Sequence, residues 1–219
     1  MITIAIDGPS GAGKSSVAAE LSKRLGILHF NTGALYRAIG LYVIKNQIDY
    51  KNEDEFNKSL NNLDIKIDFL NGKQVTILNG EDVSNQLYSN ILDEVCSTTA
   101  QYEGARNIVL TIQRNVAKTH SLVMEGRDIT WHVLPNADFK FYVTASAEVR
   151  ANRRIKDQHH TAKNLSYEEV LKDIIERDNK DINRKLYPLK IVEDAIVVDT
   201  DNLTFEEVVD SILKIIKGE

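Results

Sequence analysis

Short apolar runs and helical periods alternate through the first part of the chain. Residues 2–7 form a β-rich run that Gly8 follows at once, a pattern typical of a buried parallel strand. A helical period follows at Val17, Leu21 and Leu25, and Gly26 ends it. Residues 27–30 predict a second strand. A second helix is predicted from about Thr32, with an apolar face at Leu35, Ile39 and Tyr42.

The middle of the chain carries a different pattern with a period of two. Apolar and polar residues alternate over 63–70, Asn71-Gly72 follows, and residues 74–78 are again β-rich. An Asn-Gly pair between two such runs is the strongest short-range hairpin signal. A small antiparallel sheet is therefore predicted between roughly residues 62 and 84. Residues from about 85 to 117 are predicted to be mostly helical.

The strand and helix alternation resumes in the last hundred residues. Further strands are predicted at 122–125, 139–144 and 195–199. Two helices begin with the pattern of a capping box, Ser166 with Glu169 and Thr204 with Glu207. Their predicted apolar faces are Val170, Ile174 and Ile175 in the first, and Val208, Ile212 and Ile215 in the second. Such alternation predicts an α/β fold whose parallel sheet, of about five strands, carries helices on both faces.

Composition narrows the class of protein. With 42% hydrophobic and 27% charged residues over 219 positions, the chain is typical of one soluble domain, or of one core with a small insertion. A net charge of -5 argues against a general nucleic-acid binder, and no long uncharged apolar run predicts a membrane span. The N-terminus lacks a secretion pattern, and the single Cys96 excludes an internal disulfide and a cysteine-based zinc site. We therefore expect a cytoplasmic monomer.

The segment after the first strand matches the phosphate-binding pattern G-x-x-x-x-G-K-[ST] in full, at residues 8–15. Glycines let such a loop curl so that its N–H groups point at phosphate oxygens, and the following helix start adds partial positive charge. The lysine is expected to reach the β- and γ-phosphates, and the Ser15 hydroxyl to bind Mg²⁺ with ATP as phosphate donor. The predicted ATP-binding residues are Gly8, Pro9, Ser10, Gly11, Ala12, Gly13, Lys14, Ser15 and Ser16.

Charged residues after the other strands suggest a second anionic ligand. Arg37 follows the second strand, and Arg127-Asp128 follows the third, so both groups are expected at the carboxyl edge of the sheet. A solvated Arg37 and an internal ion pair between Arg127 and Asp128 are the alternative interpretations.

Two further sets of charged residues lie in the long polar segment. The spacing of Arg177, Asp181 and Arg184 predicts that they share one helix face, either as a ligand clamp or as an exposed ladder of ion pairs. Arg150, Arg153 and Arg154 open the segment, either on a flap that closes over the transferred phosphate or on an exposed basic helix.

Taken in order, five motifs resemble bacterial cytidylate kinase across almost the whole chain. They are Asp-Gly-Pro-Ser-Gly-Ala-Gly-Lys-Ser at 7–15, Asn-Thr-Gly-Ala-Leu-Tyr-Arg at 31–37, Glu-Asp-Val-Ser-Asn at 81–85, Glu-Gly-Arg-Asp-Ile at 125–129 and Glu-Arg-Asp-x-x-Asp-x-Asn-Arg at 176–184. The resemblance implies one kinase unit with a P-loop core at 1–32, 118–148 and 186–219. It also implies a monophosphate-binding insertion at about 33–117 and a helical lid at about 149–165.

The resemblance implies transfer of the ATP γ-phosphate to CMP or dCMP, and it assigns roles by motif. Lys14 and the lid arginines Arg153 and Arg154 would act in the transfer, as would Arg127 and Arg184. Acceptor-binding residues would be Thr32, Tyr36, Arg37, Ser97, Arg106, Arg127, Asp128, Arg177, Asp181 and Arg184. Within that set Arg37, Arg127 and Arg184 would hold the phosphate, Ser97, Arg106 and Asp128 the cytosine, and Arg177 and Asp181 the ribose.

The sequence departs from the family pattern at two places. Thr130-Trp131, followed by His132, replaces the usual Gly-Thr after Gly-Arg-Asp-Ile, and Leu87-Tyr88-Ser89 stands near the place of an Arg-Thr pair. Two alternatives therefore stay open at this stage. One is a monophosphate kinase with a shifted acceptor such as UMP, and the other is an ATP-binding regulatory module that transfers nothing. His159-His160 is interpreted as a polar loop rather than a metal site.

Overall fold

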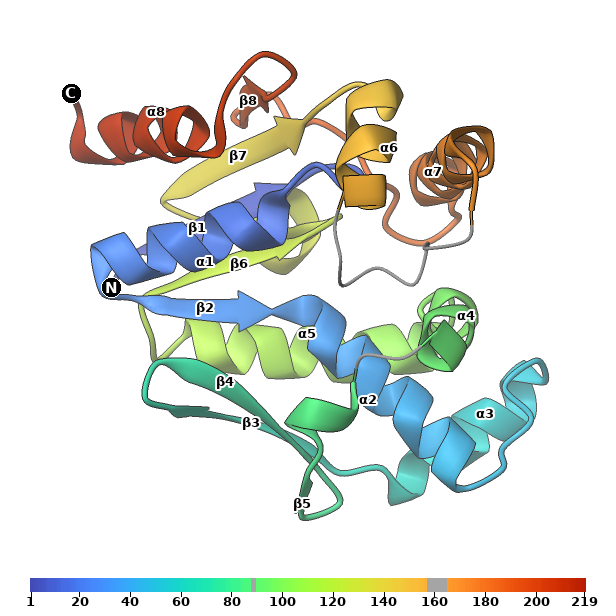
Figure 1. The fold of residues 1–219 in the computed structure, drawn as a ribbon. Coiled ribbons are helices and arrows are strands. Elements are labelled where there is room, and N and C mark those ends of the chain that lie inside the picture. Colours follow the sequence, from blue (N-terminus) through green and yellow to red (C-terminus); the bar gives the residue numbers. More distant parts are fainter. Residues whose placement is uncertain (88–89, 157–164) are drawn as a thin grey trace. The chain divides into compact units, whose positions relative to one another are not determined.

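The structure is a computed structural model that describes residues 1–87, 90–156 and 165–219. It divides into two compact units, residues 1–27 with 121–219 (the core unit) and residues 28–120 (the insertion unit). The five-stranded sheet has the order β2-β6-β1-β7-β8, and a second sheet has the order β3-β4-β5 (Figure 1). The predicted five-stranded parallel sheet with a small antiparallel insertion is confirmed.

Parallel strands form the centre of the core unit. The strands are β1 (Thr3–Asp7), β6 (Leu122–Gly126), β7 (Phe139–Thr144) and β8 (Ile196–Asp199), and β2 (Leu28–Asn31) completes the sheet. The register of β1 sets Ile6 beside Glu125 and Asp7 beside Gly126. In a parallel sheet the carboxyl ends share one edge, so the residues after β1 and β6 meet there.

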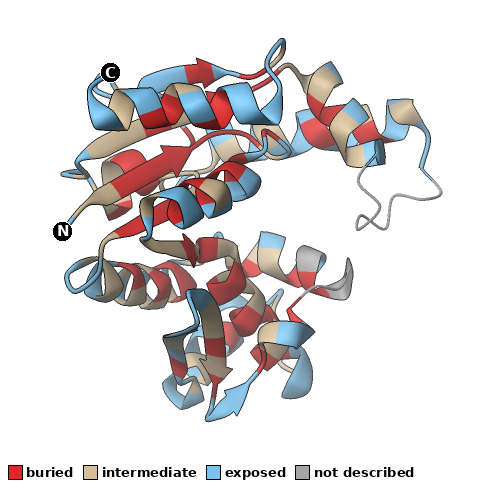
Figure 2. Cartoon of the chain, turned by 60° about the vertical axis from the view of Figure 1, so that its left-hand side comes forward, coloured by how far each residue is buried: buried red, intermediate tan, exposed pale blue. Residues whose placement is uncertain are grey.

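Two helices cover one face of that sheet. These are α1 (Lys14–Leu25) and α8 (Phe205–Lys217), whose apolar residues join those of the strands in one buried cluster. Figure 2 shows buried and exposed bands alternating along α8, as the spacing of its apolar residues predicts. Gly26 ends α1 in the left-handed conformation. The capping box at Thr204 and Glu207 is present in both directions.

The insertion unit contains the hairpin that Asn71-Gly72 predicts. Strands β3 (Ile65–Leu70) and β4 (Lys73–Leu78) pair antiparallel, and β5 (Glu81–Asp82) adds a short third strand. Asn71 and Gly72 have φ values of 52° and 75°, as a two-residue turn with matching twist requires. The helices of this unit are α2 (Thr32–Lys45), α3 (Glu53–Ser59), α4 (Asn90–Thr99) and α5 (Glu103–Ala117).

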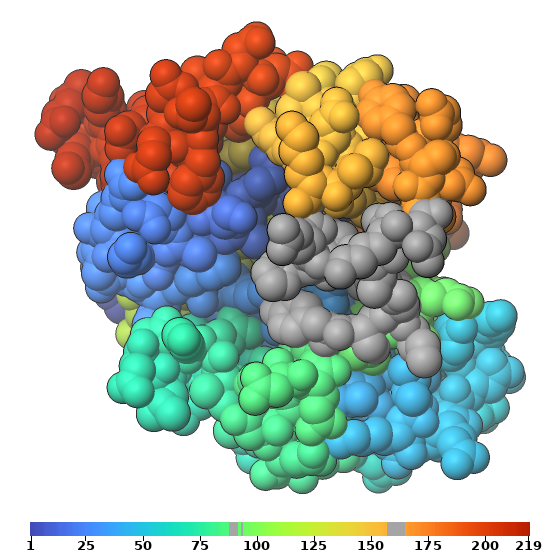
Figure 3. Space-filling view, in the orientation of Figure 1, coloured from blue at the N-terminus to red at the C-terminus, as the bar shows by residue number. Residues whose placement is uncertain are grey.

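Helices α6 (Ala147–Lys156) and α7 (Tyr167–Asn183) pack side by side in the core unit (Figure 3). The capping box at Ser166 and Glu169 starts α7, as predicted, and Val170 and Ile174 are buried. The prediction of a buried Ile175 is wrong, because this side chain is 45% exposed. Its position is one residue, or about 100°, past Ile174 on the helix, which turns it away from α6.

Candidate active site

The segment between β1 and α1 forms the curled loop that its glycines predict. Gly8, Gly11 and Gly13 have φ values of 150°, 77° and 87°. A Cβ atom at Gly8 would come within 1.9 Å of the carbonyl oxygen of Val143, so only glycine fits against β7 at this point. The loop therefore depends on glycine both for its backbone conformation and for its close contact with the sheet.

Lys14 is the charged residue at the centre of this loop. Its side chain is buried, and its Nζ donates a hydrogen bond to the carbonyl oxygen of Pro9 at 2.7 Å. Burial, with a further contribution from the nearby Arg127 charge, lowers the pKa of Lys14 to about 7, against the opposing charges of Glu125, Asp7 and Asp181. An anion bound beside this amine would therefore stabilise its charged form.

Ser15 and Glu125 form a pair of oxygen ligands next to the loop. The Ser15 hydroxyl donates to Oε1 of Glu125 at 2.9 Å, which joins the start of α1 to the end of β6. Mg²⁺ prefers oxygen ligands and is usually held by one or two protein groups together with phosphates and water. The pair fits such an ion, and the described residues hold no group of three or more His, Cys, Asp or Glu that could form a metal cage.

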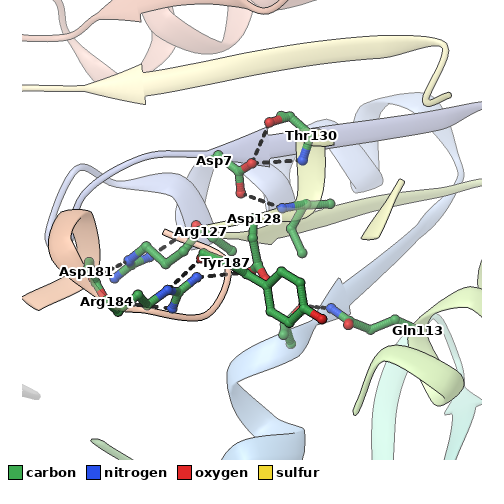
Figure 4. Close-up of polar contacts among 11 residues, drawn as sticks. Asp7, Gln113, Arg127, Asp128, Thr130, Asp181, Arg184 and Tyr187 are labelled. Atoms are coloured by element: carbon green, nitrogen blue, oxygen red, sulfur yellow. Dashed lines mark hydrogen bonds and ion pairs between the residues drawn. The ribbon is translucent and has the colours of Figure 1, made fainter. Parts of the chain in front are cut away.

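A half-buried network of ion pairs connects the end of β6 with the end of α7 (Figure 4). Nε of Arg127 donates to Oδ2 of Asp181 at 2.7 Å, and Nη2 of Arg184 lies 3.5 Å from Oδ1 of Asp128. Each of the four side chains is less than 20% exposed. Arg127 therefore pairs with Asp181 on another element, and the network is not an exposed ladder of surface charges.

The pKa of Asp181 depends on two opposing effects, its burial and the positive charges around it. Burial alone would raise it, but the charges of Arg127, Arg184 and Arg177 and the hydrogen bond from Arg127 hold it below its usual range. Asp181 is therefore ionised at neutral pH and compensates the guanidinium groups around it.

The end of α7 corrects one prediction about these residues. The helix stops at Asn183, and Arg184 has an extended backbone (φ -62°, ψ 142°), so Arg184 does not share a helix face with Arg177 and Asp181. Its side chain turns back instead, so that Nη1 lies 3.9 Å from Oδ1 of Asp181 and Nε donates to the carbonyl oxygen of Tyr187 at 2.6 Å. Arg177 lies on an exposed turn of α7.

Asp7 is a functional candidate that the sequence reasoning missed. This fully buried carboxylate accepts hydrogen bonds from the backbone N–H of Ile129 (2.9 Å) and from the N–H (2.8 Å) and hydroxyl (2.6 Å) of Thr130. Burial raises the pKa of Asp7 to about 6 against these three donors. The register that sets Asp7 beside Gly126 is the signal that could have revealed it.

Two arginines of α6, Arg150 and Arg153, have clear partners in the core unit. Arg150 is buried, and it donates to the carbonyl oxygens of Ser10 and Ala145 and pairs with Asp178 at 2.7 Å. Arg153 donates to the hydroxyl and carbonyl oxygens of Thr200 at 2.9 Å and 2.7 Å. Arg154 is half-buried on the same helix. The predicted lid extends beyond α6, and its residues 157–164, with His159-His160, lie outside the described residues.

The remaining predicted acceptor residues lie in the insertion unit. The Thr32 hydroxyl accepts from Nε2 of Gln113 at 3.0 Å, and the Tyr36 carbonyl accepts from Sγ of Cys96 at 3.3 Å. Arg37 is half-buried one turn after Thr32 on α2, and Arg106 is buried on α5. Ser97 is exposed on α4, so the structure does not place it with Arg106 on one element.

Comparison with known proteins decides the family. The sequence profile of the family "Cytidylate kinase" matches residues 4–218. The cytidylate kinases of Clostridium botulinum (strain Langeland) and Caldicellulosiruptor bescii are 44% and 40% identical to this chain. The chain belongs to the cytidylate kinase family. Both alignments cover 100% of this chain, and they cover 99% and 98% of the two relatives.

Solved structures support the fold of this cytidylate kinase family member. An uncharacterized protein from Eubacterium ventriosum matches 100% of both chains with a TM-score of 0.53 and 14% identity. Shikimate kinase from Bacteroides thetaiotaomicron matches 99% of this chain and 98% of its own, with a TM-score of 0.51 and 12% identity. At these identities the likeness shows a shared kinase-type α/β fold and nothing about the acceptor.

Family membership confirms the predicted enzyme class. The chain is a kinase of cytidylate, so the alternative of an ATP-binding module that transfers nothing is not supported. None of the helices in the described parts of the chain is long and apolar enough to cross a membrane.

Proposed function

We propose that this chain transfers the γ-phosphate of Mg-ATP to CMP and dCMP, and that the network of Arg127, Asp128, Asp181 and Arg184 is its acceptor site. The observation that carries the proposal is the position of these four side chains in the core unit. Their charges lie close enough to the phosphate-loop lysine for Arg127 and Asp181 to shift its pKa. A donor site and an acceptor site that share electrostatic contacts are what a direct transfer between two nucleotides requires.

On the donor side the backbone N–H groups of the loop at residues 8–16, apart from Pro9, hold the phosphates of ATP, and Lys14 bridges its β- and γ-phosphates. Ser15 would bind Mg²⁺ directly, and Glu125 would hold the ion or one of its waters. When bound, Mg²⁺ neutralises charge that develops on the phosphate oxygens during transfer. The hydrogen bond between Ser15 and Glu125 keeps both oxygens together for this role.

On the acceptor side the ion pairs hold two arginine side chains in place before the acceptor phosphate binds. Arg127 and Arg184 are already held by carboxylates, so the protein does not carry unpaired buried charges without substrate. When CMP binds, Arg37, Arg127 and Arg184 take its phosphate, while Asp181 and Arg177 accept and donate hydrogen bonds at the ribose. The resemblance to the family assigns Thr32 and Tyr36 of the insertion unit to the acceptor as well.

Asp128 gives the site its preference for cytosine. Cytosine presents an N4 amino donor to this carboxylate, and its N3 and O2 acceptors suit donors from Arg106 and Ser97. Uracil presents O4 at the same position, which would leave a buried carboxylate facing another acceptor. We therefore expect strong rejection of UMP.

The transfer itself needs no nucleophile from the protein. The acceptor phosphate oxygen attacks the γ-phosphorus in line with the departing ADP oxygen, and the protein contributes positioning and positive charge. Lys14, Arg127 and Arg184 supply that charge, together with Arg153 and Arg154 of the lid on α6.

The test is ADP release measured over CMP, dCMP, UMP, AMP and GMP with Mg-ATP. The proposal expects turnover with CMP and dCMP well above that with the other three acceptors. An enzyme that turns over UMP best would favour the second candidate, a shifted acceptor caused by Thr130-Trp131 next to Asp128. No turnover with CMP or dCMP would remove the proposal.

Lys14 makes ATP binding depend on pH. Its pKa is about 7 in the protein without ligand, and bound phosphates favour the charged amine, so above pH 7 ATP binding must take up a proton. The dissociation constant is expected to rise roughly tenfold per pH unit between about pH 7.5 and 9. Calorimetry in buffers of different ionisation enthalpy at pH 8.5 measures this uptake, and Lys14→Arg, which stays charged, is the control. Zero uptake by the wild type would contradict it.

Asp181 is expected to act on the acceptor only. Asp181→Asn keeps a hydrogen-bonding side chain but removes the charge that compensates Arg127. We expect the KM for CMP to rise by about tenfold to a hundredfold, because the acceptor loses its ribose contact and Arg127 loses its orientation. The KM for ATP should change little, and equal rises in both KM values would count against this role.

A further inference from the structure

The residues after Asp128 form a tight turn that hydrogen bonds to Asp7 hold in place. The N–H groups of His132 and Val133 both donate to the carbonyl oxygen of Asp128, at 3.0 Å and 3.1 Å, and close a π-helical turn over Ile129–Val133. Asp7 holds the start of this turn through its three hydrogen bonds to Ile129 and Thr130. The turn is therefore a fixed support for the two aromatic side chains that it carries, Trp131 and His132.

Those side chains pack on Tyr187, which lies in the segment after α7. The rings of His132 and Tyr187 stack with centroids 3.5 Å apart and planes at 16°, and the Trp131 ring lies 6.1 Å from Tyr187. Nζ of Lys190 lies over the Trp131 ring at 3.9 Å. We call Trp131, His132 and Tyr187 the aromatic stack. It joins two segments that each carry half of the acceptor network.

The backbone of Tyr187 shows why this stack matters. Tyr187 has a φ of 52°, a left-handed conformation that a bulky side chain rarely adopts. Pro188 follows it, and a residue before proline is further restricted toward extended conformations. Local sequence thus opposes this conformation, so tertiary contacts must hold it, and the stacked ring is the contact that can do so.

The conformation of Tyr187 also determines the position of Arg184. In this conformation the Tyr187 carbonyl oxygen accepts from Nε of Arg184 at 2.6 Å (Figure 4). With Nε held there, Nη2 faces Asp128 and Nη1 faces Asp181. The segment is also fixed at its far end, where the N–H of Leu189 donates to the carbonyl oxygen of Asp181 at 2.8 Å.

We propose that the aromatic stack is a positioning device for Arg184: it holds Tyr187 in its left-handed conformation, and the Tyr187 carbonyl then aims the Arg184 guanidinium at the acceptor phosphate. The inference rests on the proposed role of Arg184. It also assigns a role to Trp131 and His132, where this chain departs from the family pattern. These residues act on the acceptor site through Tyr187 and Arg184.

The test compares two variants of Tyr187. Tyr187→Ala removes the ring and leaves a residue for which the left-handed conformation is unfavourable, whereas Tyr187→Phe keeps the ring. The alanine variant is expected to lose roughly tenfold or more in kcat/KM for CMP, with an unchanged KM for ATP, and the phenylalanine variant to keep most of the wild-type value. Thermal unfolding of both variants checks that the fold persists.

A second readout follows the stack directly. Trp131 is the single tryptophan of the chain, so its fluorescence reports the stack without a label. Its emission is expected to change in Tyr187→Ala and to stay close to the wild type in Tyr187→Phe. Emission that is the same in all three proteins would contradict the packing that the proposal requires.

Arg184→Lys separates this inference from the proposed function. If Arg184→Lys and Tyr187→Ala both raise the KM for CMP, and the double variant is little worse than Arg184→Lys alone, the two residues act as one unit and the proposal stands. If Arg184→Lys raises this KM and Tyr187→Ala leaves it at the wild-type value, the positioning role is overturned but the acceptor site is not. If Arg184→Lys has no effect on CMP, the proposed role of Arg184 itself fails, and the inference with it.

Discussion

Arg127→Met is expected to lower kcat/KM for CMP by about a thousandfold or more, because an arginine that neutralises a transferring phosphate contributes at least that much. Arg127 interacts with both the donor site and the acceptor site. Its charge lowers the pKa of Lys14, and its Nε donates a hydrogen bond to Asp181. Methionine keeps an unbranched apolar stem and removes the cation. Steady-state kinetics at saturating Mg-ATP measure the effect, and ATP binding should persist.

Arg24→Met provides a matched control for that variant. Arg24 also pairs with carboxylates, those of Glu20 and Asp210, but it lies ten residues beyond Lys14 on α1, or about 15 Å along the helix. Exposed ion pairs contribute little to stability, so this variant should keep wild-type kinetics. Similar activity in the two variants would remove Arg127 from the transfer.

Asp128→Asn is expected to change which base the enzyme accepts. An amide can both donate and accept, so it pairs with O4 of uracil as readily as with N4 of cytosine. The ratio of kcat/KM for CMP over that for UMP should fall by about a hundredfold or more, through loss with CMP and gain with UMP. The measurement is the same acceptor panel run on wild type and variant.

The ion pair with Arg184 needs its own control in that experiment, because Asp128→Asn also weakens the contact at 3.5 Å. Arg184→Lys disturbs the same pair from the other side, and it is expected to lower both values and leave their ratio near that of the wild type. A ratio that stays constant in Asp128→Asn would show that Asp128 does not read the base.

Most of the fold follows from local patterns, because those patterns depend on contacts within a few residues. Asn71-Gly72 predicts its turn from backbone conformation alone, and the capping boxes at Ser166 and Thr204 predict where α7 and α8 begin. The strands around β1 follow from their apolar runs and from the rule that parallel strands connect through helices.

The errors concern where a helix ends and which face it buries. The spacing of Arg177, Asp181 and Arg184 assumes a helix that continues, but α7 stops at Asn183. Pro188, four residues after Arg184, is the available signal that a helix does not run through this segment. The exposure of Ile175 depends on how α6 packs against α7, and periodicity within α7 does not contain that information.

In the site, too, the residues of a contiguous motif could be predicted, whereas contacts between distant residues could not. The phosphate loop is contiguous in sequence, so Lys14 and Ser15 could be assigned from the motif alone. The pairing of Arg127 with Asp181, the buried bonds of Asp7 and the stack on Tyr187 each join residues more than 50 positions apart. Only the register of the strands and the path of the chain after α7 bring them together.

Phosphorus NMR of the enzyme with Mg-ATP and CMP tests the central claim most directly, because it identifies where the γ-phosphate goes. The CMP and ATP signals are expected to decline together while the two coupled phosphates of CDP appear with those of ADP, in equal amounts and without inorganic phosphate. Two results would contradict transfer to CMP. One is release of inorganic phosphate while CMP stays unchanged, and the other is spectra that do not change although ATP is bound at the phosphate loop.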